Sequence, residues 1–119
     1  MKKEFDLRER TALFAEKTID VLRKVRKDEI TSGILNQCMR SVGSVGANYC
    51  EASEGESVKD FVHKIRIAKK ETKESQHWFR LLAKATPELQ NEFRILWKEA
   101  QELVLIFAKS IETANKKIN

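Results

Sequence analysis

The chain has 119 residues, a length that fits one domain spanning residues 1–119, and its 41% hydrophobic residues are enough for a core. Its formal net charge of +5 favours an acidic partner such as nucleic acid or another anionic surface. The first ten residues lack the apolar segment of a secretory signal, and the longest apolar run, 103-LVLIFA-108, is too short to span a membrane. We therefore expect a soluble, cytoplasmic protein with no membrane contact.

One proline and four glycines leave few breaks, so the sequence predicts long helices. The first covers residues 7–26 and follows Asp6, a suitable N-cap, and the second covers 32–53 with Thr31 as its candidate cap. Residues at three- and four-residue spacing predict the buried faces of these helices: Leu7, Thr11, Phe14, Thr18, Val21 and Val25, then Leu35, Cys38, Val42, Val45, Tyr49 and Ala52.

A third helix is expected over 58–85, where Ser57 and Asp60 resemble a capping box, and a fourth over 87–115, opened by the cap-and-proline sequence 86-TPE-88. The last residues, 115-NKKIN-119, are expected to fray. The buried faces would be Val58, Phe61, Ile65, Ala68, Thr72, Ser75, Phe79 and Leu82, then Leu89, Phe93, Leu96, Ala100, Leu103, Phe107 and Ile111. Four long helices with short connections predict an all-α fold, an antiparallel up-down four-helix bundle.

The fourth helix carries more apolar residues than one buried face needs. Ile95, Leu96 and Trp97 are consecutive, and 103–108 is apolar on all sides. Two interpretations are open: a broad core face in a monomer, or burial against another subunit. The second is the stronger hypothesis, because so many exposed aromatic residues would be unusual on a soluble monomer.

The second helix places glycines in its middle, where each costs about 1 kcal/mol relative to alanine. Gly43, Gly46, Ala47 and Cys50 form a small-residue strip that would let another helix approach, within the chain or from another subunit. The polar row beside it, Gln37, Ser41, Ser44, Asn48 and Glu51, is expected to be buried. Packing or oligomer contacts are therefore expected at Gln37, Arg40, Ser41, Gly43, Ser44, Gly46, Ala47, Asn48, Glu51, Trp78 and Trp97.

The positive charge is concentrated on the third helix. Residues 57–86 carry eight basic and three acidic side chains, and the rest of the chain is neutral in sum. The face opposite the buried one is an unbroken row of Lys, Arg and His: Lys59, His63, Arg66, Lys70, Lys73, His77, Arg80 and Lys84. A solvated face usually mixes signs, because like charges four residues apart repel. The row could be a plain solvated surface or a surface that contacts the phosphates of a nucleic acid, and its single sign of charge favours nucleic acid. No aromatic residue interrupts the row, so base stacking is not indicated.

Two segments, 60-DFVH-63 and 74-ESQH-77, resemble the Glu-x-x-His motif of di-iron bundles. Both lie on one helix with their histidines in the basic row, so neither a metal, a cofactor nor enzymatic activity is expected. Glu71 and Glu74 are predicted to form a structural ion pair, for instance with Arg40. Cys38 and Cys50 would lie roughly 18 Å apart along one helix, too far apart for a disulfide, and reduced thiols are expected.

The run 37-QCMRSVGSVGANYCEAS-53, followed by 60-DFVHKIRIAKKETKESQHWFRLL-82, resembles the four-helix-bundle proteins encoded in intervening sequences of bacterial 23S ribosomal RNA genes. The chain departs from that family at Tyr49, Cys50 and Ser53, where smaller aliphatic residues and glycine are usual. The matching residues are Gln37, Arg40, Ser41, Ser44, Val45, Ala47, Asn48 and Glu51, then Asp60, Phe61, Ala68, Glu71, Glu74, Trp78, Leu81 and Leu82.

This resemblance implies a four-helix bundle that assembles as a homopentamer. The chain is also similar to the accessory variability proteins of diversity-generating retroelements, which implies binding to nucleic acid. The leading hypothesis is a non-enzymatic homo-oligomeric scaffold that binds RNA or DNA with little sequence specificity. The alternatives are an adaptor for a protein partner with only non-specific polyanion affinity, and a metalloenzyme. No small-molecule substrate is expected.

Overall fold

The computed structural model describes residues 6–118, and within that range the chain is all-α, with no strand. Residues 1–5, part of the segment in which no secretory signal is expected, lie outside the described residues, as does Asn119 at the end of the tail expected to fray. The elements are α1 (Leu7–Leu22), α2 (Thr31–Ser53), α3 (Val58–Ala85), the 3-10 turn η2 (Pro87–Leu89) and α4 (Gln90–Ile118).

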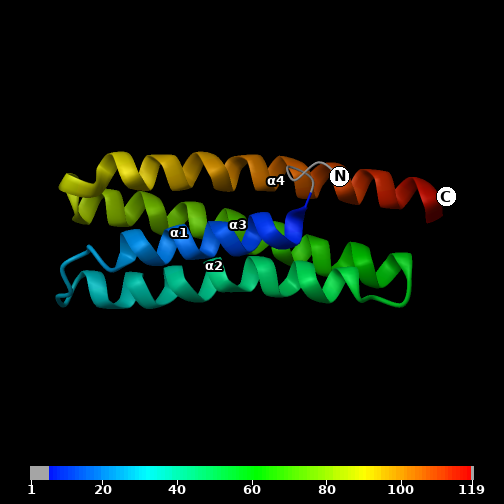
Figure 1. The fold of residues 1–119 in the computed structure, drawn as a ribbon, viewed down its shortest axis with the longest axis horizontal. Helices are drawn as coiled ribbons and strands as arrows, with labels where there is room; N and C mark the ends of the chain where they lie inside the picture. Colours follow the sequence, from blue (N-terminus) through cyan, green and yellow to red (C-terminus); the bar gives the residue numbers. More distant parts are fainter. Residues whose placement is uncertain (1–5, 119) are drawn as a thin grey trace.

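The four helices lie side by side in a molecule 49 Å long, and successive connections lie at opposite ends of it (Figure 1). The all-α fold with four helices is therefore confirmed. α3 packs along both α2 and α4 over most of its length, whereas the shorter α1 meets α4 only sparingly. No helix in the described part of the chain is both long and apolar enough to cross a bilayer.

Two of the expected helix starts are confirmed. The Asp6 carboxylate accepts a hydrogen bond from the backbone N–H of Glu9 at 3.2 Å, and α1 begins at the next residue. The Ser57 hydroxyl accepts from the backbone N–H of Asp60 at 3.1 Å. Both side chains satisfy a backbone N–H that the first turn of a helix leaves without a partner.

The connection from α1 to α2 differs from the prediction. α1 ends at Leu22 and not at residue 26, because the chain tightens into turns in which the Val25 N–H bonds the Leu22 carbonyl at 3.1 Å. Thr31 is the first residue of α2 and not its cap. Asp28 performs that role, since its carboxylate accepts from the N–H groups of Ile30 and Thr31, each at 2.9 Å. These bonds, that of Thr31 foremost, lower the pKa of Asp28.

The start and end of α4 also differ from the prediction. The Thr86 side chain makes no capping hydrogen bond, and the first turn is the 3-10 turn η2, in which the Leu89 N–H bonds the Thr86 carbonyl at 3.0 Å. Pro87 opens this turn, as expected, because it has no N–H to satisfy. At the other end the helix continues to Ile118, so most of the tail expected to fray is helical.

The core follows the predicted faces of all four helices, and Phe79 joins α1, α3 and α4 within it. The Phe79 ring meets Phe14 edge-on at 6.0 Å between centroids and Phe93 at 6.2 Å. The buried threonines Thr11, Thr18 and Thr72 each donate to the carbonyl four residues earlier at 2.7 Å, which satisfies their hydroxyls within the helix. The exceptions are four residues predicted to be buried that are half-buried, Leu35, Tyr49, Val58 and Phe61, and several buried residues outside the predicted faces, among them Val62, Gln76, Val104 and Ala114.

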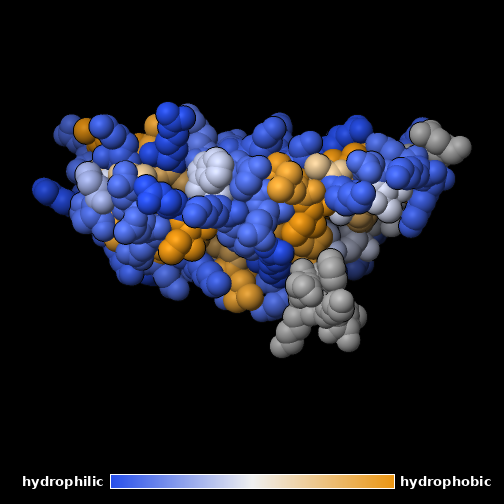
Figure 2. Space-filling view, turned by 90° about the horizontal axis from the view of Figure 1, so that it is seen from above, coloured by the Kyte–Doolittle hydropathy of each residue, from blue (hydrophilic) through white to orange (hydrophobic). Residues whose placement is uncertain are grey.

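A single chain leaves several large apolar side chains uncovered. The most exposed are Ile30 at 71%, Ile95 at 67% and Leu105 at 60%, followed by Leu13 and Trp97 at 40% each. Figure 2, which views the molecule from the α4 side, shows hydrophobic residues in separate patches between hydrophilic ones. The run 103–108 is therefore not buried on all sides within the protomer, because its Leu105 faces solvent.

Candidate nucleic-acid interface

All eight side chains of the basic row on α3 are exposed. The same helix buries Ile65, Ala68 and Phe79 almost completely on its opposite side, where α2 and α4 pack. The helical period of 3.6 residues therefore separates the two faces cleanly. The row, defined as before, comprises Lys59, His63, Arg66, Lys70, Lys73, His77, Arg80 and Lys84.

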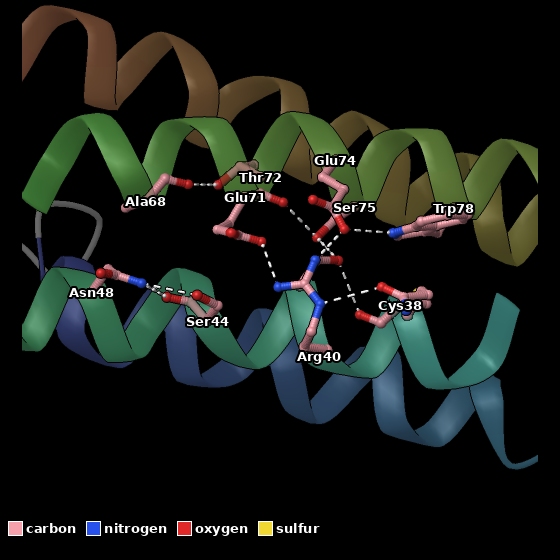
Figure 3. A network of polar contacts seen from close by, with 12 residues as sticks. Cys38, Arg40, Ser44, Asn48, Ala68, Glu71, Thr72, Glu74, Ser75 and Trp78 are labelled. Carbon is pink, nitrogen blue, oxygen red and sulfur yellow. Dashed lines mark hydrogen bonds and ion pairs between the residues drawn. The ribbon is translucent and has the colours of Figure 1, made fainter. Parts of the chain in front are cut away.

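Two of the three acidic side chains of α3, Glu71 and Glu74, pair with a residue outside the row, and the third, Asp60, forms no ion pair among the described residues. Arg40 of α2 forms ion pairs with Glu71, at 3.2 Å, and with Glu74, as predicted (Figure 3). The Trp78 indole N–H donates to Glu74 at 3.0 Å. Among residues 6–118 no member of the row lies within 4.0 Å of a carboxylate oxygen. The row is therefore a surface of one sign, free to attract an anion.

The hydrogen bond from Trp78, and after it the one from Arg40, lower the pKa of Glu74 below its ordinary value of 4.5. A carboxylate with a lowered pKa in the folded state stabilises the protein above pH 4.5, and that contribution is lost as the pH falls through the lowered pKa. We expect Glu74→Gln to lower the free energy of unfolding at pH 7, because it removes the charge that pairs with Arg40. The loss should be only about 1 kcal/mol, because this ion pair is partly exposed. Below the lowered pKa the difference should vanish.

Urea unfolding at pH 7 and at a pH low enough to protonate Glu74 in the folded protein measures this difference. Glu88→Gln is the matched control, because Glu88 is exposed and contacts no cation among the described residues. An equal loss of stability from Glu74→Gln at both pH values would show that charge has no part in its role.

Within the protomer, the polar row of α2 is buried only in part, and its two ends are exposed. Ser41 is fully buried, and its hydroxyl lies 2.8 Å from that of Ser75 on α3. Asn48 is half-buried and donates to the carbonyl and the hydroxyl of Ser44 (Figure 3). Gln37 and Glu51 are exposed within the protomer. Glu51 instead pairs with Lys64 of α3 at 2.6 Å.

The two central glycines of α2 face different surroundings. A Cβ atom at Gly46 would lie 3.1 Å from the Thr11 hydroxyl oxygen of α1, closer than side chains usually approach. A Cβ atom at Gly43 would meet nothing within 4 Å, and Ala47 is also exposed. Gly46 therefore serves packing between α1 and α2 within the chain, whereas Gly43 and Ala47 lie on an open surface.

The residues that resembled a catalytic or metal site lie apart. His63 and His77 point outward in the basic row, and residues 6–118 bring no three His, Cys, Asp or Glu side chains together as a metal site would. Both cysteines are free. Burial raises the pKa of the Cys38 thiol to about 12, so this thiol stays protonated at neutral pH.

Sequence reasoning missed two arrangements that join distant segments. Arg10 of α1 holds both carboxylate oxygens of Glu99 on α4, at 2.8 and 2.9 Å, and also Glu102 at 2.8 Å. These carboxylates raise the pKa of Arg10, with Glu99 as the main cause. The second arrangement is a groove of about 450 Å³ where Trp97 of α4 lies near the end of the basic row. The one sequence signal for the Arg10 arrangement is that Glu99 and Glu102 lie three residues apart, on one face of α4.

Fold and surface together define a small four-helix bundle with a single-sign basic face. Residues 3–113 match the model of the 23S rRNA-intervening sequence protein family, so the chain belongs to that family, which confirms the resemblance noted in the sequence. A crystal structure of a protein of unknown function from the S23 ribosomal protein family of Bacteroides thetaiotaomicron VPI-5482 is similar, with a TM-score of 0.79 and 24% identity. The similarity covers 87% of this chain and 96% of that one, and it supports the fold. No curated protein matches the chain.

Proposed function

We propose that this protein is a non-enzymatic scaffold that assembles as a homo-oligomer and binds RNA or DNA through the basic row of α3. The observation that carries the proposal is the row itself: eight exposed cationic or titratable side chains with no carboxylate partner among the described residues. From Lys59 to Lys84 the row extends about 38 Å at 1.5 Å per helical residue. Such a length suits a polyanion better than a small anion.

The kind of contact follows from the residue types. Lys and Arg on a straight helix face contact phosphates, which position a nucleic acid without reading its bases. Binding would then release counterions, and its affinity would fall steeply with salt. We infer weak sequence preference, because a row of mainly cationic side chains is attracted to the phosphates of any sequence.

Self-association is the second half of the proposal. It is supported by the exposed apolar side chains of Ile95 and Leu105 on α4 and Leu13 on α1. In a monomer these side chains would be in contact with water, whereas a second subunit could cover them. A pentamer is the form that the family resemblance implies. Five copies would carry a formal charge of about +25, which attracts nucleic acid strongly at physiological salt. The solution mass at low and high salt tests the assembly.

The salt dependence of binding tests the nucleic-acid half. We expect Lys70→Gln with Lys73→Gln to reduce the slope of log K against log[salt] for duplex DNA by about 1.8, near 0.9 for each lost phosphate contact. Fluorescence anisotropy with a labelled duplex measures it. Lys109→Gln with Lys116→Gln is the matched control, because these lysines lie on α4 beside Glu112.

An unchanged slope in the Lys70 and Lys73 variant would overturn the assignment of the row. Affinity of only about 10⁻⁴–10⁻⁶ M at physiological salt, insensitive to both variants, would instead favour the alternative of an adaptor for a protein partner.

A further inference from the structure

One groove stands out near the connection between α3 and α4, at the left of Figure 1. Its volume is about 450 Å³, within the range of sites that hold small organic groups. The last two members of the basic row, Arg80 and Lys84, line one wall, and Arg94 and Lys98 of α4 line the other. Among the residues that line it there is no acid, so the groove is a local concentration of positive charge.

The groove also holds an accessible aromatic ring. Trp97 is 40% exposed, although Phe93, one turn earlier on the same wall, is buried in the core at 1%. The Trp97 carbonyl accepts a hydrogen bond from the Gln76 side chain of α3 at 3.3 Å. Gln76 also donates to Gln101 at 3.0 Å, so two polar contacts hold α4 against α3 beside Trp97. The ring is therefore presented on a well-packed pair of helices and not on a loop.

The four cations of the groove are available to a ligand. Among residues 6–118 none of them lies within 4.0 Å of a carboxylate oxygen. Arg94 makes one hydrogen bond, to the side-chain oxygen of Asn91 at 3.3 Å, which is neutral. Four like charges around the ring also disfavour a second copy packing the same patch against itself. An anionic, flat ligand fits this chemistry better than an apolar helix does.

We propose that this groove binds an unpaired nucleotide of a single-stranded nucleic acid. Its base stacks on Trp97, and the flanking phosphates contact Arg80 and Lys84 on one side and Arg94 and Lys98 on the other. The inference rests on the proposed function and deepens it, because it adds a preference for single strands at one end of the basic row. Stacking on a side chain requires a base free of its own stack, and duplexes do not offer one.

The test compares single strands with ligands that have the charge but no free base. Labelled oligouridylate and oligothymidylate, a duplex of the same length and polyglutamate are titrated against the full chain at one salt concentration. Trp97→Leu is expected to weaken binding of both single strands about 5- to 150-fold, the range for one stacked base. Binding of the duplex and of polyglutamate should change less than about twofold, because their contacts are electrostatic.

Trp97→Phe keeps a ring at this position and guards against a folding defect in the leucine variant. It should retain most of the single-strand affinity but lose the quenching of tryptophan fluorescence by single strands, leaving only the Trp78 emission. Equal weakening for all four ligands, or none for the single strands, would overturn the nucleotide site while leaving the basic row in place. If the unmodified chain binds no nucleic acid at all, the proposed function and this inference both fail.

Discussion

Reversing four charges of the basic row, with Arg66, Lys70, Lys73 and Arg80 changed to glutamate, is expected to abolish binding to nucleic acid at physiological salt. Losing four phosphate contacts lowers affinity on the order of a thousandfold by counterion release alone, and the new carboxylates repel phosphate in addition. All four side chains are exposed, so each change should alter the free energy of unfolding by less than about 0.5 kcal/mol. Filter retention or fluorescence anisotropy at about 150 mM salt measures the loss of nucleic-acid binding.

Net charge alone could mimic this result, and α1 and the connection after it offer a matched control. The control set is also two arginines and two lysines: Lys17, Arg23, Arg26 and Lys27. All four are exposed, and they form no ion pair among the described residues. Their reversal changes the total charge equally but leaves α3 intact, and it should weaken binding far less. If both variants lose binding equally, only the total charge matters. If neither does, the row is a solvated surface.

The exposed basic row was predictable because it follows from the sequence of α3 alone. The same period that buries Ile65, Ala68 and Phe79 forces the positions opposite them outward, so the faces of α3 follow from residues within four positions of one another. Capping at Asp6 and Ser57 was predictable for the same reason, since donor and acceptor lie three residues apart. Asp28 escaped notice because its role depends on the turn geometry that follows α1.

The polar row of α2 shows where a local pattern becomes ambiguous. At 100° for each residue, Glu51 lies roughly 60° from Asn48 and 80° from Ser41 around the helix, whereas Gln37 lies between Ser44 and Asn48. That rotation carries Glu51 to the edge of the row and into solvent, but it does not explain why Gln37 is exposed. A spacing of four and three residues therefore cannot tell a buried polar row from one at the edge of an interface.

The arrangements that the sequence could not reveal join residues far apart in the chain. The pairing of Arg10 with Glu99 spans 89 positions, and the groove brings Trp97 beside Arg80 across the turn between α3 and α4. Considered along α3 alone, the row contains no aromatic residue, and base stacking is not indicated. The structure supplies the ring from the neighbouring helix, so the ligand chemistry of the row depends on how the two helices pack.

Replacing Gly46 with leucine is expected to lower the free energy of unfolding by about 2 kcal/mol or more. The added Cβ atom alone would lie 3.1 Å from the Thr11 hydroxyl and 3.9 Å from its backbone carbonyl carbon, so Thr11 must shift before the remaining three carbons of the leucine are placed. Overpacking of this kind costs about 1–3 kcal/mol and sometimes more. It outweighs the gain of about 0.8–1 kcal/mol from removing a glycine in a helix. Urea unfolding with a two-state fit measures the change.

Gly43→Leu isolates the packing effect, because it makes the same substitution one turn earlier on the same helix. A side chain at Gly43 meets nothing within 4 Å in the protomer, so this variant should be as stable as the parent or more stable, by up to about 1 kcal/mol. Equal stability of the two leucine variants would refute close packing at Gly46. A Gly43 variant that stays folded but loses the oligomer would place the open surface of α2, with Ala47 beside Gly43, at a contact between subunits. The two glycines would then serve different interfaces, one within the chain and one between chains.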